Sequence, residues 1–395
     1  MIPIMYGSPS NRLIGPSIHY TIMPHSQNLD VDLLLKLPPG GPLNRAYYRI
    51  IGEALLDDTR DYGHQELIQF TAPTGELIRC EVLRDSIHVW FAIRTADAGA
   101  LPGIIDNLLF HASLHQNDVQ KALKRLEKTE EGYWHLGYGG EILPFRDVRL
   151  RDLRISYRHI ALPRNVFISV SGTKSLAYLK RKIESVVANE SSIAAGYFAR
   201  DPLAPEFLTT GSRPIDSIAF IMPVVHPEVE GFTTDLLTMF ALGSGKGSIL
   251  FKDLRQKAEW SYRQEAFFES DLKGLRPIVE IASTHVHNPN KEASQARLII
   301  SQAIDHLSKT DVERAVAMAK AVFRRGIGMN PFAYLSKDQS PLFFNNYWRM
   351  KTGHKFHINQ LVQLMESVPV KSVMQTAKSL FGSAVVRVVM GKSVN

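Results

Sequence analysis

The sequence predicts an α+β protein with two duplicated domains, each an antiparallel sheet with helices packed on one side. Three observations lead to this prediction. A chain of 395 residues is long for a single compact core. The same order of strand and helix patterns occurs twice along it. A stretch rich in Ser, Ala, Pro and Gly, 189–214, separates the two copies and is typical of a linker. We therefore expect one domain over 1–188 and the other over 215–395.

The first half alternates strand and helix patterns. Strands are expected where apolar and polar residues alternate, and helices where apolar residues recur at i, i+3 and i+4. A Pro/Gly-rich turn, 38–42, separates the first strand from the first helix. The expected elements are, in order, a strand at 28–36, a helix at 44–56, strands at 67–70, 76–83 and 87–93, helices at 101–109 and 119–126, a closing helix at 148–160 and a closing strand at 165–170.

The second half repeats this order. A strand again leads into a helix, then a Gly-rich turn and a second helix, two strands, two long helices and a closing helix–strand pair. The expected elements are a strand at 216–225, helices at 232–242 and 249–257, strands at 261–270 and 276–284, helices at 291–307, 311–325 and 370–381, and a strand at 384–390. Two copies of this length indicate a duplicated domain rather than a short repeat array.

Composition and charge narrow the classes of function. Apolar residues make up 45% and charged residues 22%, as in ordinary folded proteins. The formal charge is +7, but Lys and Arg are spread along the chain, and the densest runs, 121–128 and 146–158, also carry acidic residues at helical spacing. Such runs are typical of solvated helix faces, so we expect no nucleic-acid partner. A nucleic-acid binder would show affinity that falls steeply with salt, and a basic groove for acidic peptide stays open.

The cysteine content and the apolar runs bear on the compartment. Cys80 is the only cysteine, so no intrachain disulfide can form, and a reducing compartment fits. Residues 1–20 lack a basic segment followed by an apolar one, and no uncharged run is long enough to cross a bilayer. We expect a cytoplasmic protein without a membrane partner; a leader that had been removed would leave the same pattern.

The segment 242–262 carries the most specific motif. It contains a Gly-rich turn with Gly243, Gly245 and Gly247, then Leu-Phe, an acidic residue and Leu-Arg, and its Tyr262 follows Arg255 by seven positions. This segment resembles the second-domain signature of the insulinase/pitrilysin metallopeptidases, in the group with half-size chains such as mitochondrial processing peptidase. The resemblance implies that each chain is one half of a clam shell.

The end of the first half extends the resemblance. A helix over 148–157 leads through Pro163-Arg-Asn165 to a strand that ends at Gly172, similar to the close of the family's first domain. Together the motifs and the duplication cover the chain from about residue 28 onward. One departure is that the segment 127–140 is much shorter than in active members, so a helix or two is missing.

The zinc motif is absent. Active members carry His-x-x-Glu-His on the first helix, where the two imidazoles bind zinc, the Glu activates the bound water, and a Glu on a following helix is the third ligand. At that place the chain has Arg49, Gly52 and Glu53, and no such motif occurs among its 14 histidines. We therefore expect no metal and no other cofactor in this chain, and no catalysis by it alone.

Two histidine pairs imitate parts of a metal site. His111 and His115 have the spacing of the motif, but Leu114 takes the place of the base, so we interpret them as surface or helix-end residues. His285 and His287 would share one strand face, but no third ligand is evident nearby.

Patterns for other enzyme classes are incomplete. A phosphate-binding loop needs Gly-Lys-Ser/Thr, whereas Lys246 is followed by Gly247. No Gly-x-Ser-x-Gly elbow occurs, and Cys80 lies in a strand pattern. The family's Gly-rich turn accounts for the same residues without a nucleotide.

The resemblance assigns a substrate role to Arg255 and Tyr262. In active members this pair reaches the substrate backbone at the zinc site and stabilises the developing oxyanion, and an Arg fork and a Tyr hydroxyl suit that task. The residues alone equally allow a solvated helix Arg and a core Tyr. In half-size members one chain can carry the zinc and the other this pair, with the peptide added to a sheet edge. The resemblance suggests 76–83 as that edge.

The sequence therefore predicts a non-catalytic subunit. It would bind an extended peptide and complete the active site of a zinc-bearing, insulinase-like partner in a heterodimeric peptidase. The alternative is a structural or assembly subunit of the same fold with no part in proteolysis.

Overall fold

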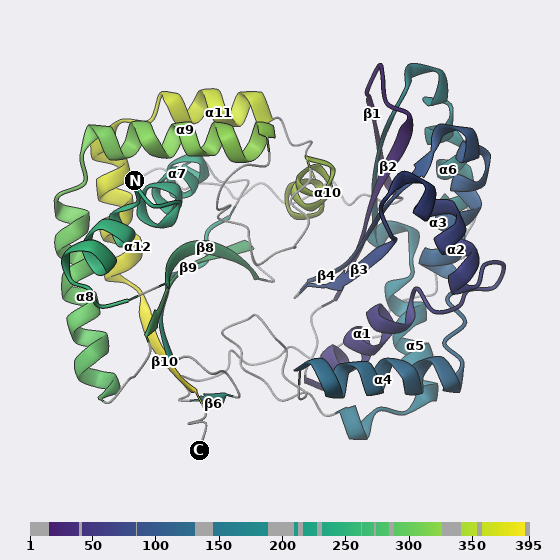
Figure 1. Cartoon of the computed structure of the whole chain (residues 1–395), viewed down its shortest axis with the longest axis horizontal. Helices are drawn as coiled ribbons and strands as arrows, with labels where there is room; N and C mark the ends of the chain where they lie inside the picture. The colour runs from purple at the N-terminus through teal and green to yellow at the C-terminus, as the bar shows by residue number, and fades with distance from the viewer. Residues whose placement is uncertain are drawn as a thin grey trace, which may run out of the picture.

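The computed structural model describes the chain in two groups of elements, which Figure 1 shows on either side of a central space. The described residues are 16–38, 42–83, 85–130, 145–188, 209–211, 216–226, 231–261, 263–271, 274–283, 288–325, 341–353 and 358–391. No helix among them is long and apolar enough to cross a membrane.

The first half contains one sheet and a layer of helices. Its strands are β1 (Ser17–Ile22), β2 (Asn28–Lys36), β3 (Arg79–Val82), β4 (Ser86–Arg94) and β5 (Val166–Gly172). Its helices are α1 (Pro42–Ala54), α2 (His64–Thr71), α3 (Leu101–Phe110), α4 (Gln116–Glu130), α5 (Leu150–Ile160) and α6 (Leu179–Ala188).

The second half repeats the arrangement. Its strands are β6 (Thr209–Gly211), β7 (Asp216–Ile221), β8 (Arg263–Asp271), β9 (Gly274–Ser283) and β10 (Val385–Gly391). Its helices are α7 (Phe232–Gly243), a π-helix (Phe251–Lys257), α8 (Pro289–Asp305), α9 (Lys309–Arg325), α10 (Pro341–Thr352), α11 (Ile358–Glu366) and α12 (Val370–Gly382).

Strand order confirms the predicted duplication and fold class. The first sheet runs β1-β5-β2-β4-β3 and the second β6-β10-β7-β9-β8, so each strand has a counterpart at the same place in the other sheet. The pairs within each sheet are antiparallel except at one end, where β1 and β5, and likewise β6 and β10, are parallel. The sequence did not predict the two parallel end pairs, because β1 and β6 were not recognised as strands. Strand β6 lies within the predicted linker, 189–214.

One predicted strand is a helix. Residues 67–70 belong to α2, which begins where the Glu66 Oε2 atom accepts a 2.7 Å hydrogen bond from the Gly63 N–H. Leu67 and Thr71, one helical turn apart, are both buried. The short apolar run is therefore the buried face of a helix. The hydrogen bond at the N-cap residue Gly63 favours a helix over a strand for this run.

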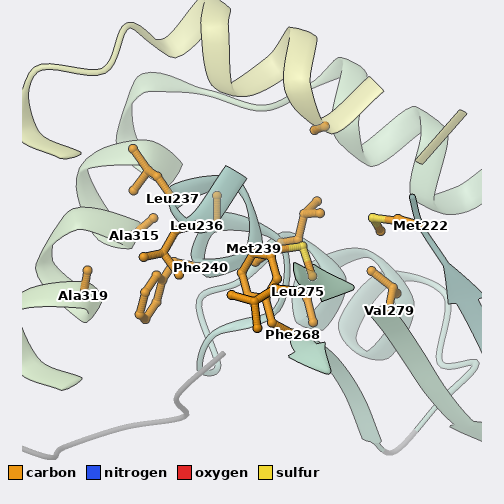
Figure 2. Close-up of a cluster of buried hydrophobic side chains, with 14 of the residues drawn as sticks. Met222, Leu236, Leu237, Met239, Phe240, Phe268, Leu275, Val279, Ala315 and Ala319 are labelled. Carbon is orange, nitrogen blue, oxygen red and sulfur yellow. The ribbon is translucent and has the colours of Figure 1, made fainter. Parts of the chain in front are cut away.

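The core of the second half surrounds α7. Figure 2 shows Leu236, Leu237 and Phe240 of this helix among side chains of the sheet and of α9. Phe268, Leu275 and Val279 come from the sheet, and Ala315 and Ala319 from α9; all are at most 1% exposed. Because α7 is apolar on nearly every side, it is a central helix with no solvent face.

Helix α10 follows α9 in the chain but packs on the sheet of the first half, and Figure 1 shows it between the two halves. On one side Phe343 lies 4.7 Å from the His88 ring of β4. On the other side Trp348 lies 5.3 Å from Phe232 of α7, and Phe344 lies 5.6 Å from Phe323 of α9. The prediction that helices cover one side of each sheet was thus incomplete, because α10 covers the second face of the first sheet.

Hydrogen bonds fix α10 on that face. The fully buried Asn346 donates to the Asp32 carbonyl and to its Oδ1, both at 2.7 Å. Arg349 donates to the carbonyl oxygens of Ser17 at 2.7 Å and Ile168 at 3.0 Å. His88 Nε2 lies 2.7 Å from Asp32 Oδ2. Buried polar groups that are bonded in this way specify one packing, and losing a partner is costly.

Candidate functional site

The three residues that the resemblance assigns to the zinc-motif positions lie where α1 meets the edge strand β3. Arg49, Gly52 and Glu53 are all on α1, as predicted, and β3 is the last strand of the described sheet. A Cβ atom added at Gly52 would lie 2.1 Å from Val82 Cγ2 and 3.8 Å from Cys80 Sγ. The helix therefore approaches the strand so closely that the Val82 side chain occupies the space a residue at position 52 would need.

Ion pairs fill the rest of this corner. Arg125 of α4 donates to the Glu53 carbonyl at 2.7 Å and to its Oε2 at 3.3 Å, and also to Asp57 Oδ2 at 2.7 Å. Burial alone would lower the pKa of Arg125, but the hydrogen bond and charge of Asp57, with those of Glu53, raise it. Glu53 is thus held as the partner of a cation on the facing helix.

Arg49 and Cys80 complete the corner. Burial lowers the pKa of the Arg49 guanidinium, and the charges of Glu53, Cys80 and Glu81 oppose this shift. Burial also raises the pKa of the Cys80 thiol, with Glu53 adding to the effect and Arg49 opposing it. A thiol kept protonated is neither a good nucleophile nor a metal ligand.

These residues do not fit a zinc ion. Two of the nearest groups, Arg49 and Arg125, are cations that can only donate hydrogen bonds, whereas zinc needs deprotonated N, O or S ligands. The base position is a glycine with no room for a carboxylate. Within the described ranges, no group of three His, Cys, Asp or Glu side chains is placed to hold a metal ion. No step of a zinc mechanism can be assigned to this corner.

The β3 backbone has a defined outer edge. Cys80 pairs with Val89 and Val82 with Ile87, and the hydrogen bond from the Leu83 N–H to the Ser86 carbonyl sets the ladder. In an antiparallel pair the bonded positions alternate, so Leu83, Glu81 and Arg79 bond to β4. The N–H and C=O groups of Cys80 and Val82 consequently point away from β4. This agrees with the expectation that 76–83 contributes a sheet edge.

The Gly-rich turn after α7 serves packing. A Cβ at Gly243 would lie 2.2 Å from the Ala266 nitrogen of β8, Gly245 has φ +77°, and a Cβ at Gly247 would lie 2.7 Å from Arg314 Cδ. Arg314 donates to the Ser244 carbonyl at 2.6 Å and the Ala241 carbonyl at 2.9 Å, capping the C-terminal end of α7. Close packing and the positive φ account for these glycines, so a nucleotide-binding role is not needed to explain them.

Arg255 lies in the π-helix that follows this turn. The helix has an i, i+5 hydrogen bond, from the Ala258 N–H to the Asp253 carbonyl at 3.1 Å, and Glu259 after it has φ +50°. The Arg255 side chain is exposed, with its guanidinium carbon 5.3 Å from the centre of the Phe251 ring. π-Helical turns are rare and are frequent at functional sites. Tyr262 lies outside the described residues, so its position relative to Arg255 remains a prediction.

Among the described residues, His111 and His115 belong to no group of three possible metal ligands. Arg60 can only donate, so the 3.3 Å contact of its Nη1 makes His111 Nδ1 an acceptor. The proton of His111 is then on Nε2, which lies 3.2 Å from Asp106 Oδ2. His115 is exposed, as expected of a surface residue. His285 and His287 lie outside the described residues.

The sequence analysis did not identify two residues of this corner: Val82, which fills the space beside Gly52, and Arg125, which pairs with Glu53. Arg125 is 72 positions from Glu53, and it belongs to a charged helix face that carries no local mark of a partner. The one available signal for Val82 is the glycine at position 52, since a helix glycine often marks a close approach.

Three solved structures show the same fold over almost the whole chain. A protease from Helicobacter pylori has a TM-score of 0.73 at 12% sequence identity, covering 95% of this chain and 97% of its own. A peptidase M16 inactive domain from Pseudomonas fluorescens has a TM-score of 0.72 at 10% identity, covering 96% of both chains. A conserved protein from Enterococcus faecalis has a TM-score of 0.69 at 11% identity, covering 96% of this chain and 97% of its own.

At these identities the likeness shows the fold, which is that of M16-like peptidases, the insulinase-like fold that the sequence motifs predicted. No protein-family model matches the chain, and no curated protein matches its sequence.

Proposed function

We propose that this chain is a non-catalytic, insulinase-like subunit that binds an extended peptide along β3 and completes the active site of a zinc-bearing partner chain. The observation that carries the proposal is the corner of α1 and β3. There Arg49, Gly52 and Glu53 cannot hold zinc, yet β3 stays at the end of the sheet, with the backbone groups of Cys80 and Val82 directed outward. These observations support a chain that has lost its zinc ligands and has retained a strand edge for main-chain recognition.

Two further observations support the proposal. The fold matches, among others, a structure described as an inactive M16 peptidase domain. Arg255, exposed on a π-helix, keeps the charged fork that could donate to a peptide carbonyl or a developing oxyanion. Zinc would be supplied by the partner and not by this chain.

Peptide binding can be tested on this chain alone. The probe is fluorescein-labelled, reduced and carboxymethylated α-lactalbumin, an unfolded polypeptide, and anisotropy reports binding. Cys80→Pro removes an outward N–H without removing a bond to β4, so it should weaken binding about tenfold. Cys80→Ala, which keeps the N–H, is the matched control and should bind as the unaltered chain does. Equal binding by both variants would exclude strand addition at β3.

The role in catalysis needs the zinc-bearing partner, purified together with this chain. Arg255→Ala or Tyr262→Phe should lower turnover on the order of a hundredfold, the usual loss for one oxyanion donor, while the complex and its melting temperature stay unchanged. Lys246→Ala removes an exposed charge from the adjacent Gly-rich turn and should have no such effect. Wild-type turnover in both site variants would favour the alternative, a structural subunit with no part in proteolysis.

A further inference from the structure

The first half contains a cavity of about 940 Å³ that is separate from the α1–β3 corner. Its walls come from the connection between α1 and α2, from the loop 110–115 after α3, and from α5. Cavities of this size hold small-molecule or short-peptide ligands in many proteins. Neither the zinc-motif residues nor β3 contributes to its lining.

The loop 110–115 joins the two other walls and has a fixed conformation. The Ser113 N–H donates to the Asp58 carbonyl at 3.0 Å, and Thr59 and Ala112 form an antiparallel bridge. One residue further on, the Leu114 carbonyl accepts from Arg154 Nε at 3.3 Å and Nη2 at 3.1 Å. Leu114 has φ +44°, which costs about 1–2 kcal/mol for a residue with a side chain, and its burial and the Arg154 contact hold it there.

The α5 wall is basic. Arg154 and Arg158 are one helical turn apart, both are exposed, and both line the cavity. Within the described part of the chain, neither forms an ion pair: Arg154 contacts the Leu114 carbonyl and Arg158 contacts no acidic group. Two guanidinium groups in this arrangement suit a carboxylate, which can accept from both.

The wall from the α1–α2 connection is acidic. Asp58 lines it without a side-chain partner among the described residues, and Glu66 uses its Oε2 atom for the Gly63 N–H. Arg60 adds little free positive charge here, because it lies 3.1 Å from Asp61 and 3.5 Å from Asp106. Tyr62 and Phe110 add apolar surface to the lining of the cavity.

We infer that this cavity binds a short peptide with free ends, its carboxylate on Arg154 and Arg158 and its ammonium group on Asp58 and Glu66. Opposite charges on two walls of a cavity that also has apolar lining fit a ligand that carries opposite charges at its two ends. A fully anionic ligand would meet the carboxylates of the α1–α2 wall, and a fully cationic one would meet the α5 wall. The inference is independent of the proposed function, since the cavity and β3 share no residue.

The experiment titrates the full chain by calorimetry with the tetrapeptide Ala-Phe-Leu-Ala in three forms: free, N-acetylated and C-amidated. The free form should bind, and each blocked form should bind about tenfold to a hundredfold more weakly, since each loses charged hydrogen bonds. Arg158→Ala should cause a similar loss with an unchanged melting temperature. Arg151→Ala, on the same helix and exposed but outside the cavity, is the matched control.

A cycle of variants and blocked ends assigns each end to its wall. Amidation should cost less affinity in Arg158→Ala than in the unaltered chain, because only Arg154 is left to bind the carboxylate, and acetylation should likewise cost less in Asp58→Asn. The inference is wrong if the three forms bind equally, if no form binds at millimolar concentration, or if inorganic phosphate displaces the peptide completely, which would indicate a simple anion site. Cys80→Pro should leave this binding unchanged, so a failure here is distinct from a failure of the proposed function.

Discussion

Each half packs a helix against the edge strand of its own sheet, and the two contacts differ in kind. In the first half, Gly52 of α1 meets a side-chain methyl, Val82 Cγ2 of β3. In the second half, Gly243 of α7 meets backbone, with the Ala266 nitrogen 2.2 Å and its Cα 2.7 Å from an added Cβ. The Val82 side chain can change its rotamer, whereas a strand backbone cannot move without breaking its pairing. The second contact is thus fixed by the fold, whereas the first could be opened by changing one side chain.

The halves also differ in the origin of the helices that pack on them. The first sheet is covered on its second face by α10, which belongs to the second half by sequence, and the contact includes several buried hydrogen bonds as well as apolar packing. The helix α7 that anchors the second half is apolar on nearly every side. Both halves have an apolar core, but only the first also depends on buried hydrogen bonds to a helix that is distant in the sequence.

The largest expected effect is at Asn346. Replacing it with Leu would remove two bonds to Asp32 and leave the buried Arg349 and Ser169 with fewer partners. Unfolding free energy should fall by about 4 kcal/mol, because several buried polar groups lose partners together. Denaturant melts measure the loss, and Asn165→Leu, at a turn before β5, should cost much less. A loss below about 1 kcal/mol would mean that α10 is held by its apolar contacts.

Gly243→Ala should come next, with a loss of about 3 kcal/mol, because the strand backbone must shift to admit one methyl group. The matched control is Gly382→Ala in α12, where an added Cβ meets nothing within 4 Å. That change should be neutral or stabilising, since Ala is the better helix residue. If both variants melt alike, the contact between α7 and β8 is looser than its distances indicate.

A third difference is a partly buried acid in the first turn of α7, where α1 has none. Burial raises the pKa of Asp235 from 3.8 to about 6. Between these values the folded protein binds more protons than the unfolded chain, so stability should fall as pH rises from about 4 to 6 and then level off. Asp235→Asn should remove this slope and be the more stable protein at pH 7. Melting temperatures across this range test it.

Asp311 is a control for Asp235, because its pKa is shifted in the opposite direction. Burial alone would raise its pKa, but hydrogen bonds from Lys252 and Ser308 lower it below 3.8. Its contribution to stability is present above that value and is lost as pH falls through the lowered pKa. Asp311→Asn should therefore destabilise the protein at pH 7, whereas a gain there would show that the ion pair with Lys252 is not favourable.

The smallest effect should be at Gly52. Gly52→Ala should cost only about 1 kcal/mol, and Val82→Ala in the same chain should relieve the clash, so the two changes are not additive. Rebuilding the motif as R49H, G52E and E53H should give no stoichiometric zinc by elemental analysis, because Val82 and Arg125 remain. Tight zinc in that variant would show that the motif alone was missing.

The sequence predicted the duplicated fold because its patterns are local. Helix periodicity identified α1, α3, α7, α9 and α12 near their true bounds, and alternation identified β4 and β9. Through a resemblance, Arg49, Gly52 and Glu53 were expected on the first helix and 76–83 at a sheet edge; that the helix lies against this edge was not predicted. The sequence patterns did not identify α2, which has only two turns, or the strands β1 and β6, which lie at the outer end of each sheet.

Helix α10 could not be foreseen from its residues. Its partners lie far away, since Asn346 and Asp32 are 314 positions apart, and Arg349 and Ile168 are 181 apart. The signal that existed was on the sheet. The run Leu33–Leu34–Leu35 in β2 is apolar on consecutive positions, which indicates a strand covered on both faces. The cover itself could only be found in three dimensions.

The crossing of α10 has a consequence for how the chain is made. A ribosome releases the elements of the first half through α6 long before it releases α10, and at ordinary rates of synthesis the interval is on the order of ten seconds. During that time Leu34 and Phe167, which join the core of the second half in the finished protein, have no such partner. We therefore expect chaperones to bind the nascent first half until α10 has been synthesised and covers this face of the sheet. For the same reason, cleavage of the folded protein between α6 and β6 should leave two fragments that stay associated through the contact of α10 with the first sheet.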